Sequence, residues 1–564
     1  MAAVLEAGLY ADSAENAGPL EPPDPHPVVR YRRTLPRRHR LLVTFLVGLN
    51  VGVSTGVLVW IALQEPGASQ VGVAAFALLV VAEGMRITQN VSLWMFAIVA
   101  RDPVPIEPPS GLRVALTTTF VPSREPIEML ERTLRAMTRV EYHGSVDAWV
   151  LDEGDDPAVQ ALAASLGVHH FTRKGRPEYH QVEGPFRART KHGNHNAWRT
   201  EHEHRYNVVA HVDPEHAPRP QFLNRTLGYF TDPDVAFVVG PHVYANRRDG
   251  FVARAAATHF YPFLAIIQRG GNGMGAPMLV GAAHLYRTAA WDQIGGFQDS
   301  ITEDHLTGLV VQTTRNPVTA HAWKAVYTPD VVTLGEAPVT WTDYFNQQTR
   351  WARGTCDVVL HHSPSLLRRL SRRQRLAYAA LQAYYPGLAT TWLCGNVLLL
   401  LALVFGITPV QRGAIWVLPI WACVNLGQYA MILGLRRYNL AEHERRELAF
   451  NAIVLTAVTA PIYAAAVAGA VLRRRLAFVV TGKGELSLAD SPWTFRYHLG
   501  WLIMIASALM VAAWRRNLEA AFVPWLLISV LVACTPMVSS LRRRRRSRPR
   551  SPHPSLGCEA QARG

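Results

Sequence analysis

The sequence predicts an α/β domain with a Rossmann-like sheet, combined with an α-helical multi-pass membrane domain. Three observations lead to this prediction. Apolar runs long enough to cross a bilayer lie on both sides of a central region with soluble composition. Within that region, short apolar runs alternate with helical patterns. Acidic residues directly follow several of these runs, where open α/β sheets place ligands. With 564 residues, the chain is long enough for both parts.

The N-terminal region, residues 1–40, is expected to be a disordered, basic and cytoplasmic segment. Residues 1–28 are acidic, Pro-rich and without hydrophobic periodicity, which is typical of disorder. Arginines then cluster between Arg30 and Arg40. No cleavable signal peptide is expected, because the first apolar run begins only after this polar stretch.

Two transmembrane helices are expected within residues 41–100. Leu41–Leu63 and residues 71–100 are both apolar over lengths that span a bilayer. The second run contains Glu83 and Arg86, which lie three residues apart on one face of the expected helix. This spacing predicts an ion pair between the two side chains.

The central region, residues 101–365, has the pattern of a soluble domain. Its expected elements are strands at Val114–Phe120, Val146–Leu151, Asn207–Val212 and Val235–Gly240, with an amphipathic helix at Ile127–Met137. Strands that alternate with helices indicate a parallel sheet. Asp152 and Asp213 directly follow two of the strands. Both are therefore candidates for contacting a ligand at the carboxyl edge of the sheet.

The C-terminal region, residues 366–540, is expected to contain interface helices and about four transmembrane helices. Residues 366–384 are amphipathic and rich in Arg. Apolar runs follow near residues 385–405, 415–435, 448–472, 498–514 and 519–540. Residues 541–564 are expected to form a basic cytoplasmic tail.

The distribution of Arg residues predicts the topology, because cytoplasmic loops carry an excess of positive charge. The clusters at Arg30–Arg40, Arg436-Arg437, Arg473–Arg475 and Arg542–Arg550 share one side of the membrane if residues 448–472 lie in the interface. Six spans then remain. The central domain and both termini are expected in the cytoplasm, with the protein in the inner or plasma membrane.

Composition narrows the expected partners. The formal net charge is +15, and the basic runs flank apolar segments. This placement favours the lipid bilayer as partner, and no nucleic-acid partner is expected. The five cysteines form no CxxC pair, which argues against a disulfide framework and a zinc site.

An acidic motif at Asp213-Pro214-Glu215-His216 has the composition of a metal site. Asp213 and Glu215 alternate by one residue, so both carboxylates can point to one side and hold a divalent ion against a diphosphate leaving group. His216 offers a nitrogen ligand, so either Glu215 or His216 could complete the site. A solvated loop is the alternative interpretation of this motif alone.

Asp304 is the candidate general base. It belongs to Thr302-Glu303-Asp304, at the start of a helix expected through Gln312. When a hydroxyl group attacks a carbon centre and inverts its configuration, a nearby carboxylate is needed to take the proton of that hydroxyl. A position at a helix start would favour the ionised form. A plain helix cap is the alternative interpretation.

The segment Gln347-Gln348-Thr349-Arg350-Trp351 is expected to bind sugar. Gln347, Arg350 and Trp351 share one helix face. Trp351 offers a flat apolar ring to a sugar, and Arg350 offers five hydrogen-bond donors. The alternative is a helix packed through Trp351 with Arg350 on the surface.

Taken in chain order, the motifs are Asp152-Glu153, Asp213-Pro214-Glu215, Thr302-Glu303-Asp304 and Gln347-Gln348-Thr349-Arg350-Trp351. They resemble the DD, DxD, TED and Q-x-x-R-W motifs of the processive family-2 glycosyltransferases, the cellulose-synthase-like enzymes. Glu215 departs from the family pattern, which has Asp. The resemblance covers residues 111–490 and includes Phe478–Gly484, which is similar to the family's F-x-V-T-x-K-G stretch. It implies a GT-A fold for residues 101–365, a UDP-sugar donor, and Mg²⁺ or Mn²⁺ as cofactor.

The resemblance also implies roles for individual residues. Asp304 would be the catalytic base. The donor would be bound by Thr119, Asp152, Glu153, Lys191 and Asp213, and the metal by Asp213 and Glu215. The acceptor would be bound by Glu303, Gln347, Arg350 and Trp351. His192 and His195, which flank Gly193 and Asn194 after Lys191, are interpreted as ordinary polar loop residues.

The expected function is inverting transfer of a sugar from a nucleotide-sugar donor to a growing β-linked polysaccharide. The reaction is expected to be processive and coupled to export through the chain's own spans, and accessory export proteins are further candidate partners. A non-processive transferase that acts on a lipid carrier is the first alternative. The second is a transporter or receptor with a soluble insert, which would carry charged residues deep in its spans and internal repeats.

Overall fold

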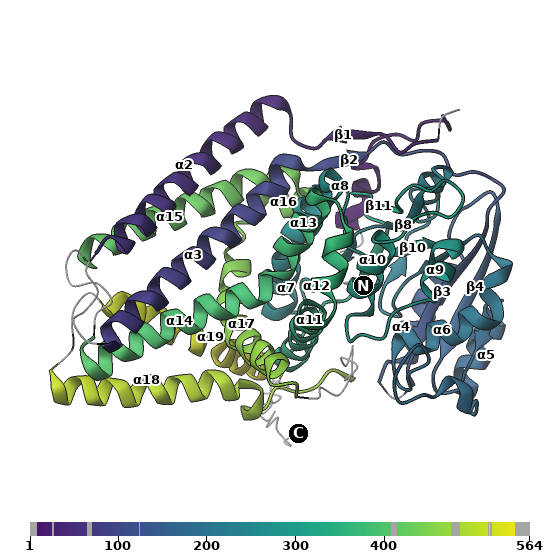
Figure 1. The fold of residues 1–564 in the computed structure, drawn as a ribbon. Coiled ribbons are helices and arrows are strands. Elements are labelled where there is room, and N and C mark those ends of the chain that lie inside the picture. The colour runs from purple at the N-terminus through teal and green to yellow at the C-terminus, as the bar shows by residue number, and fades with distance from the viewer. Residues whose placement is uncertain are drawn as a thin grey trace, which may run out of the picture.

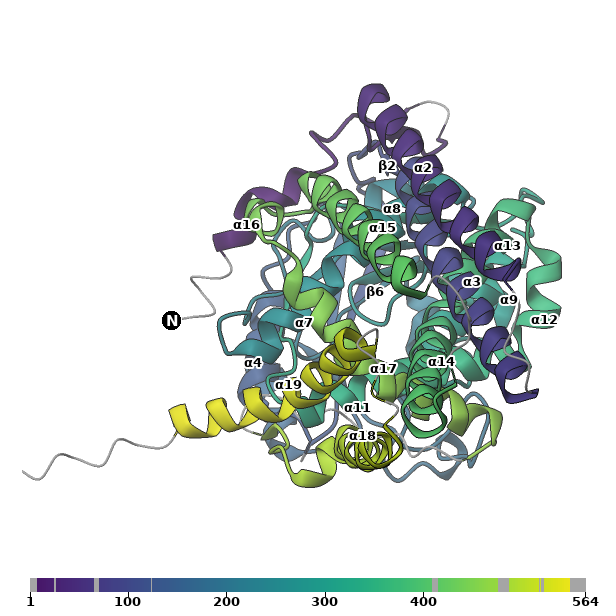
Figure 2. The same ribbon diagram turned by 90° about the vertical axis from the view of Figure 1, so that its left-hand side faces the viewer.

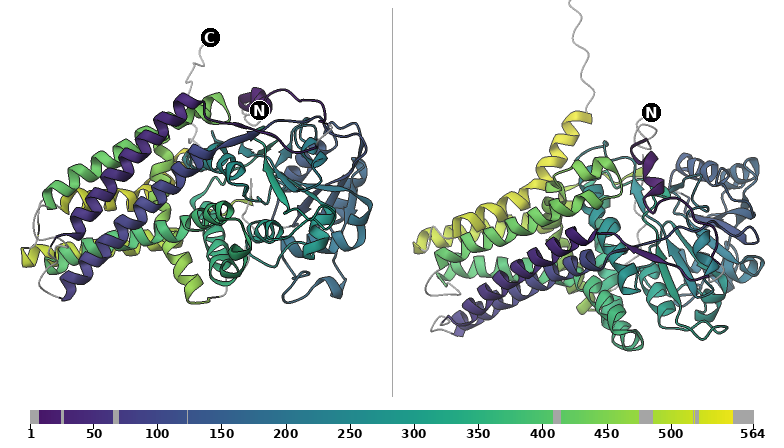
Figure 3. Two further views of the ribbon diagram at one scale, coloured as in Figure 1. Left: turned by 45° about the horizontal axis from the view of Figure 1, so that its top comes forward. Right: turned by 90° about the horizontal axis from the view of Figure 1, so that it is seen from above.

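The computed structural model describes residues 8–24, 27–64, 70–122, 124–407, 414–474, 486–516, 518 and 522–547, without the side chains of 414–418 and 544–547. The described chain forms a sheet domain and a bundle of long helices that projects from one side of it (Figure 1). Two further views show the same division (Figure 3). The bundle takes its helices from before and after the sheet domain, so that domain is an insertion between membrane helices.

The main sheet contains β3 Arg113–Phe120, β4 Ser145–Asp152, β5 His169–Phe171, β6 Val208–His211, β8 Val235–Val239, β10 His284–Arg287 and β11 Lys324–Tyr327. Their order across the sheet is β11-β8-β10-β6-β3-β4-β5. The pairs β3–β4, β3–β6, β4–β5 and β8–β11 are parallel, whereas β10 is antiparallel to both β6 and β8. The prediction of a parallel sheet is therefore wrong at β10. The alternation of strands and helices does not reveal the direction in which a strand enters the sheet.

The strands are apolar on both faces because helices cover both faces of the sheet. In β3, Val114 and Leu116 contact a core that includes Leu130 of α4 (Ile127–Met137). Ala115, on the opposite face, contacts a second core that includes Trp198 of α6 (Lys191–His202). Because β3 pairs parallel with both β4 and β6, the carboxyl ends of these three strands lie at one edge of the sheet.

The remaining described elements of this domain surround the sheet. The helices are α5 Pro157–Ser165, α7 Phe251–Pro262, α8 Gln268–Met274, α9 Thr288–Ile294, α10 Glu303–Gln312 and α11 Trp341–His361. A second, three-stranded sheet is formed by β7 Ala217–Pro218, β12 Thr333–Gly335 and β9 His242–Tyr244. The strands β1 Tyr31–Arg33 and β2 Arg101–Pro103 pair antiparallel. Together these elements form a mixed α/β domain, which confirms the predicted α/β class of the central region.

The bundle has the composition of a multi-pass membrane protein. Six described helices are long and apolar enough to cross a membrane. They are α2 Arg37–Ala62, α3 Gln70–Val99, α14 Tyr384–Phe405, α17 Phe450–Val471, α18 Arg496–Arg515 and α19 Val523–Ser547. Another helix, α15 Ala414–Leu435, has 22 residues and no charged side chain. The prediction that the α/β domain is combined with a multi-pass helical membrane part is thus confirmed.

Helix α17 runs in a different direction from its neighbours. Seen along the bundle, α14 and α18 are viewed nearly end-on, whereas α17 lies across the view (Figure 2). Leu455, Val458 and Ile462 of α17 pack against a core with Trp341 and Tyr344 of α11. The placement of residues 448–472 in the membrane interface stays a prediction. The predicted F-x-V-T-x-K-G stretch lies outside the described residues.

The predicted ion pair in the second span is confirmed. Arg86 Nη2 lies 2.7 Å from the Glu83 carboxylate, and both side chains are nearly buried within the described structure. The pair neutralises two charges inside an apolar helix.

The expected disorder of residues 1–28 is wrong for residues 8–24, 27 and 28. The Tyr10 side chain is fully buried, and its ring packs edge-on against His443 with centroids 4.9 Å apart. The backbone N–H of Ala17 donates to Asp330 at 2.7 Å. Few apolar residues suffice to order this segment, because they pack against residues distant in the sequence, such as Val331 and Leu440.

Candidate active site

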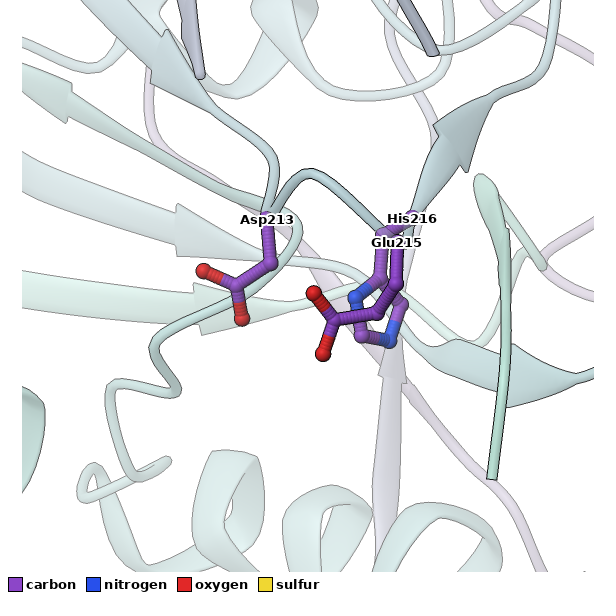
Figure 4. A group of neighbouring side chains, drawn as sticks. All are labelled: Asp213, Glu215 and His216. Atoms are coloured by element: carbon purple, nitrogen blue, oxygen red, sulfur yellow. The ribbon is translucent and has the colours of Figure 1, made fainter. Parts of the chain in front are cut away.

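The candidate metal ligands lie in the loop that follows β6. One ligand atom from each of Asp213, Glu215 and His216 lies within 4.8 Å of the others. The two carboxylates are on the same side of the loop, and the His216 ring lies behind Glu215 (Figure 4). Two carboxylates and an imidazole are a donor set that suits Mn²⁺ and is compatible with Mg²⁺. The residues therefore fit a divalent ion, with His216 placed to contribute beside Glu215.

The small sheet fixes the position of the His216 ring. Gly335 of β12 lies so close that a Cβ built on it would be 2.2 Å from His216 Cδ2. A larger residue at position 335 would displace the ring. The three-stranded sheet therefore supports the candidate metal site.

Lys191 lies at the start of α6 and contacts Asp213. Thr190 caps this helix through its hydroxyl, which accepts the N–H of Gly193 at 3.1 Å. The Lys191 ammonium contacts the Asp213 carboxylate and donates to the carbonyl of Gly281 at 2.9 Å. Although burial opposes both charges, Lys191 holds the pKa of Asp213 well below its ordinary value, and Asp213 raises the pKa of Lys191. Both groups are charged at neutral pH.

Asp304 is held by two backbone N–H groups. His305 donates to its Oδ1 and Gly281 donates to its Oδ2, both at 2.7 Å. Burial raises the pKa of Asp304 despite these hydrogen bonds. The backbone N–H of His305 at the helix start favours the ionised form, as expected, but burial has the larger effect on the pKa of Asp304. A carboxylate with a raised pKa is a better proton acceptor.

Glu303 is the second carboxyl at this helix start. Burial and the neighbouring Asp304 raise its pKa to about 7. Two adjacent carboxyl groups in different environments can differ in protonation state at neutral pH, so that one is protonated while the other is ionised.

The predicted acceptor residues of α11 line one cavity with the acidic groups. Gln347, Arg350, Trp351, Glu303 and Asp304 all border this space, which has a volume of about 1650 Å³. Thr340 caps α11 through its hydroxyl, which accepts the N–H of residue 343 at 3.1 Å. The Trp351 ring stacks on Phe260 of α7 with centroids 6.3 Å apart.

The predicted donor residues at the ends of β3 and β4 divide into two groups. Thr119 and Glu153 border the cavity, and Glu153 pairs with Arg173 at 2.7 Å. Asp152 is fully buried, and its carboxylate accepts the N–H groups of Gly154 at 2.8 Å and Asp156 at 2.6 Å. Its observed contacts shape the loop that carries Glu153.

A cluster of buried histidines lies beneath Asp213. His211 Nε2 is 3.3 Å from Asp213 Oδ1, and His195 packs edge-on against His211 with centroids 4.4 Å apart. Burial lowers the pKa of His211 to about 4, so the ring is neutral. The interpretation of His192 and His195 as polar loop residues is wrong, because both are buried in α6.

The contact between His211 and Asp213 was not predicted from the sequence. A signal was present, since His211 and Asp213 alternate along an extended segment and so face the same side.

In the metal-free protein, Glu303→Gln should remove a pH-dependent loss of stability. The native pKa of Glu303 lies above its ordinary value, so the folded protein binds the proton more tightly than the unfolded chain. The stability from this proton is lost as pH rises from about 4.5 through about 7. The melting temperature of wild type should therefore fall relative to Glu303→Gln between about pH 5 and about pH 8. Thermal unfolding in chelator tests this, with the exposed Glu178→Gln as control. A constant difference would contradict it.

The comparisons with known proteins agree with the site. A family model described as "Glycosyl transferase family group 2" matches residues 208–435. This range contains Asp213, Asp304 and the α11 residues through Trp351.

Curated proteins give a related result. The chain is 25% identical over 371 residues to the "Cellulose synthase catalytic subunit [UDP-forming]" of Xanthomonas axonopodis pv. citri, which covers 62% of this chain and 47% of that protein. It is 27% identical over 287 residues to "Cellulose synthase 1" of Komagataeibacter xylinus, which covers 49% of this chain and 17% of that protein. The chain thus spans about half of the Xanthomonas protein and less of the other.

Among solved structures, the mannosyltransferase PcManGT from Pyrobaculum calidifontis, in complex with GDP-Man and Mn²⁺, has a TM-score of 0.47 and 16% identity. The match covers 71% of this chain and 99% of that chain.

Proposed function

We propose that this chain, a family-2 glycosyltransferase related to the bacterial cellulose synthases, transfers a sugar from a UDP-sugar to a growing β-linked polysaccharide. The transfer inverts the anomeric carbon and is processive. The product leaves through the chain's own membrane helices.

The donor is bound at the carboxyl edge of the sheet. We assign its contacts to Thr119, Asp152, Glu153, Lys191 and Asp213, with Asp152 acting through the loop that it shapes. Asp213, Glu215 and His216 would hold Mg²⁺ or Mn²⁺, which neutralises the negative charge that develops on a diphosphate leaving group. Lys191 lies close enough to Asp213 to place a positive charge at the same diphosphate.

Asp304 acts as the general base. The acceptor hydroxyl gives its proton to the Asp304 carboxylate while its oxygen forms the new bond to the sugar C1. The bond between C1 and the phosphate oxygen breaks, and UDP leaves. Glu303, Gln347, Arg350 and Trp351 position the acceptor, with the Trp351 ring against the apolar face of the sugar.

The observation that carries this proposal is the continuity of the cavity. From Asp213 and Asp304 it extends between helices α3, α14, α15 and α17 of the bundle. Its membrane half carries aromatic, hydroxyl and amide side chains, among them Gln89, Asn90, Tyr384, Tyr385, Thr391, Trp392, Asn425, Gln428 and Thr456, between aliphatic side chains such as Leu93, Leu388, Leu426 and Ile453. Aromatic rings and hydrogen-bonding groups suit a sugar chain better than a lipid tail. The polar and aromatic members of this lining, and not its aliphatic ones, are the basis on which we propose a polysaccharide acceptor over a lipid carrier.

Isolated membranes supplied with a panel of radiolabelled nucleotide sugars test the proposal. One UDP-sugar should give both UDP release and labelled product of high molecular weight. Labelled product that is extracted into organic solvent would indicate a lipid carrier. No UDP release from any donor would contradict a transferase, and a transporter or receptor would then be the better interpretation.

Trp351→Ala should weaken elongation more than donor binding. Loss of ring stacking is expected to raise the acceptor KM about tenfold or more. Trp351→Phe keeps an aromatic ring and should retain most of the activity. Product length and UDP binding are the measurements. If Trp351→Ala loses its fold, the packing of Trp351 on Phe260 is its main role.

We further propose a location in the inner or plasma membrane, with the sheet domain and both termini in the cytoplasm. Tags placed after Arg474 and in the C-terminal tail should then be protected from outside in intact cells. A tag placed after Ile407 should be accessible. External labelling after Arg474 would mean that α17 crosses the membrane, and six spans would be wrong.

A further inference from the structure

The segment between α11 and α14 carries five arginines with no role in the proposed reaction, and one of them, Arg375, donates to backbone carbonyls of its own segment. It contains α12 Ser363–Leu366, a short turn, and α13 Arg372–Gln382. Arg368, Arg369, Arg372 and Arg373 are all exposed, and none forms an ion pair within the described chain. No acidic residue occurs between positions 363 and 384. The resulting basic face, named the α12–α13 arginine face, lacks a countercharge from its own segment.

The exposed side of α13 changes from basic to apolar along the helix. Arg372 and Arg373 begin it, and the exposed Leu376, with 53% of its surface accessible, and Ala379 follow one turn apart. The candidate span α14 starts at Tyr384. This order matches the passage from lipid headgroups to hydrocarbon. Seen along the bundle, α12 and α13 lie at the rim of the molecule, where lipid can reach them (Figure 2).

The opposite side of α13 contacts the neighbour of the candidate base. Gln382 Nε2 lies 3.1 Å from His305 Nε2, and Ser363 donates to Gln382 Oε1 at 2.9 Å. The Tyr378 ring packs edge-on against His305 with centroids 6.0 Å apart. His305 in turn donates its backbone N–H to Asp304 at 2.7 Å. One helix therefore connects the arginine face with the carboxylate of the base.

We propose that the α12–α13 arginine face binds the phosphate headgroups of anionic phospholipids, and that this contact seats α13 against His305. Guanidinium groups bind phosphate oxygens through paired hydrogen bonds. A basic cluster on an amphipathic helix next to a span is the pattern that anionic lipids recognise. Lipid binding by the arginine face does not depend on the proposed function. The expected effect of that binding on activity, through His305 and the base Asp304, rests on the proposed function.

Lipid retention by the full-length protein tests the proposal without any turnover. The protein in detergent is mixed with phosphatidylglycerol or phosphatidylcholine, and bound lipid is counted by native mass spectrometry. Arg369→Gln, Arg372→Gln and Arg373→Gln are combined in one variant. Each Arg near a lipid surface changes affinity about fivefold, so the triple variant should bind phosphatidylglycerol on the order of 100-fold more weakly.

A matched control removes the same charge from the sheet domain. It combines Arg113→Gln, Arg139→Gln and Arg315→Gln, three exposed positions outside the membrane helices. This control should retain phosphatidylglycerol like wild type. Equal binding of the two lipids by wild type, or equal phosphatidylglycerol binding by both triple variants, would overturn the proposal. Equal retention of the two lipids by wild type overturns the proposal even if a variant does not fold.

Activity in nanodiscs then tests the coupling to the base. Phosphatidylglycerol should stimulate UDP release by wild type and by the control, and less by the arginine-face variant. Arg→Lys at positions 369, 372 and 373 keeps the charge and should restore stimulation. Normal lipid retention without UDP release in wild type would contradict the proposed function alone. Retention with no stimulation would contradict the coupling through His305.

Discussion

Asp304→Asn is expected to lower the rate of sugar transfer by about 10²–10⁴-fold while donor binding persists. The amide has nearly the shape of the carboxylate but cannot accept the proton of the acceptor hydroxyl. The donor contacts at Asp213 and Lys191 remain. UDP release and UDP binding, measured separately, distinguish loss of the base from loss of the donor site.

Asp232→Asn is the matched control for this change. Asp232 is also buried, and its two carboxylate oxygens also accept backbone N–H groups, from Val29 at 3.3 Å and Asp234 at 3.0 Å. It does not border the cavity. Asp232→Asn also weakens an ion pair with Lys324, at 3.1 Å, so its structural cost should be at least that of Asp304→Asn, and only Asp304→Asn loses a candidate base. Similar losses of activity in both, or normal turnover in Asp304→Asn, would remove Asp304 from the mechanism.

Local patterns were sufficient to predict most elements of the fold. The helix at Ile127–Met137 has the predicted bounds, because its apolar side has the helical period and faces the sheet. The strand predicted at Val114–Phe120 begins one residue earlier, at Arg113. The direction of β10 could not be predicted, since it depends on how α7 and α8 return the chain to the sheet. The order of the N-terminal segment likewise depends on contacts with distant residues such as His443.

The candidate site was predicted as a set of residues, and the structure adds their geometry. Asp213, Asp304 and Trp351 border one cavity although they are far apart in the sequence. The contact between Lys191 and Asp213 depends on the close approach of α6 to the end of β6, which no local pattern reveals. The burial of Asp152 was also invisible, because a strand-end acid can turn toward the ligand or toward its own loop.

Asp213→Ala should abolish metal-dependent donor binding. Asp213 is the candidate ligand that also contacts Lys191 and His211, so its removal takes away one carboxylate and leaves the ammonium without that partner. The loss of Mn²⁺ affinity should exceed the about 10–100-fold that the loss of an outer-shell partner costs. Electron paramagnetic resonance of free Mn²⁺ measures this affinity without turnover. Chelator added to wild type should reproduce the loss of donor binding.

Asp299→Ala is the control, since the Asp299 side chain has the same exposed fraction as that of Asp213, 24%, and also forms an ion pair, with Arg187. It lies outside the candidate ligand set and should leave Mn²⁺ affinity within about twofold, as expected for a position that makes no metal contact. Glu215→Asp keeps a carboxylate and should be tolerated, because an oxygen ligand remains available. If the Mn²⁺ titration of Asp213→Ala matches that of wild type, or if wild type transfers sugar in excess chelator, the ion is not held at this loop. Lys191 and the arginines that line the same cavity, such as Arg189 and Arg350, would then supply the positive charge available to the diphosphate.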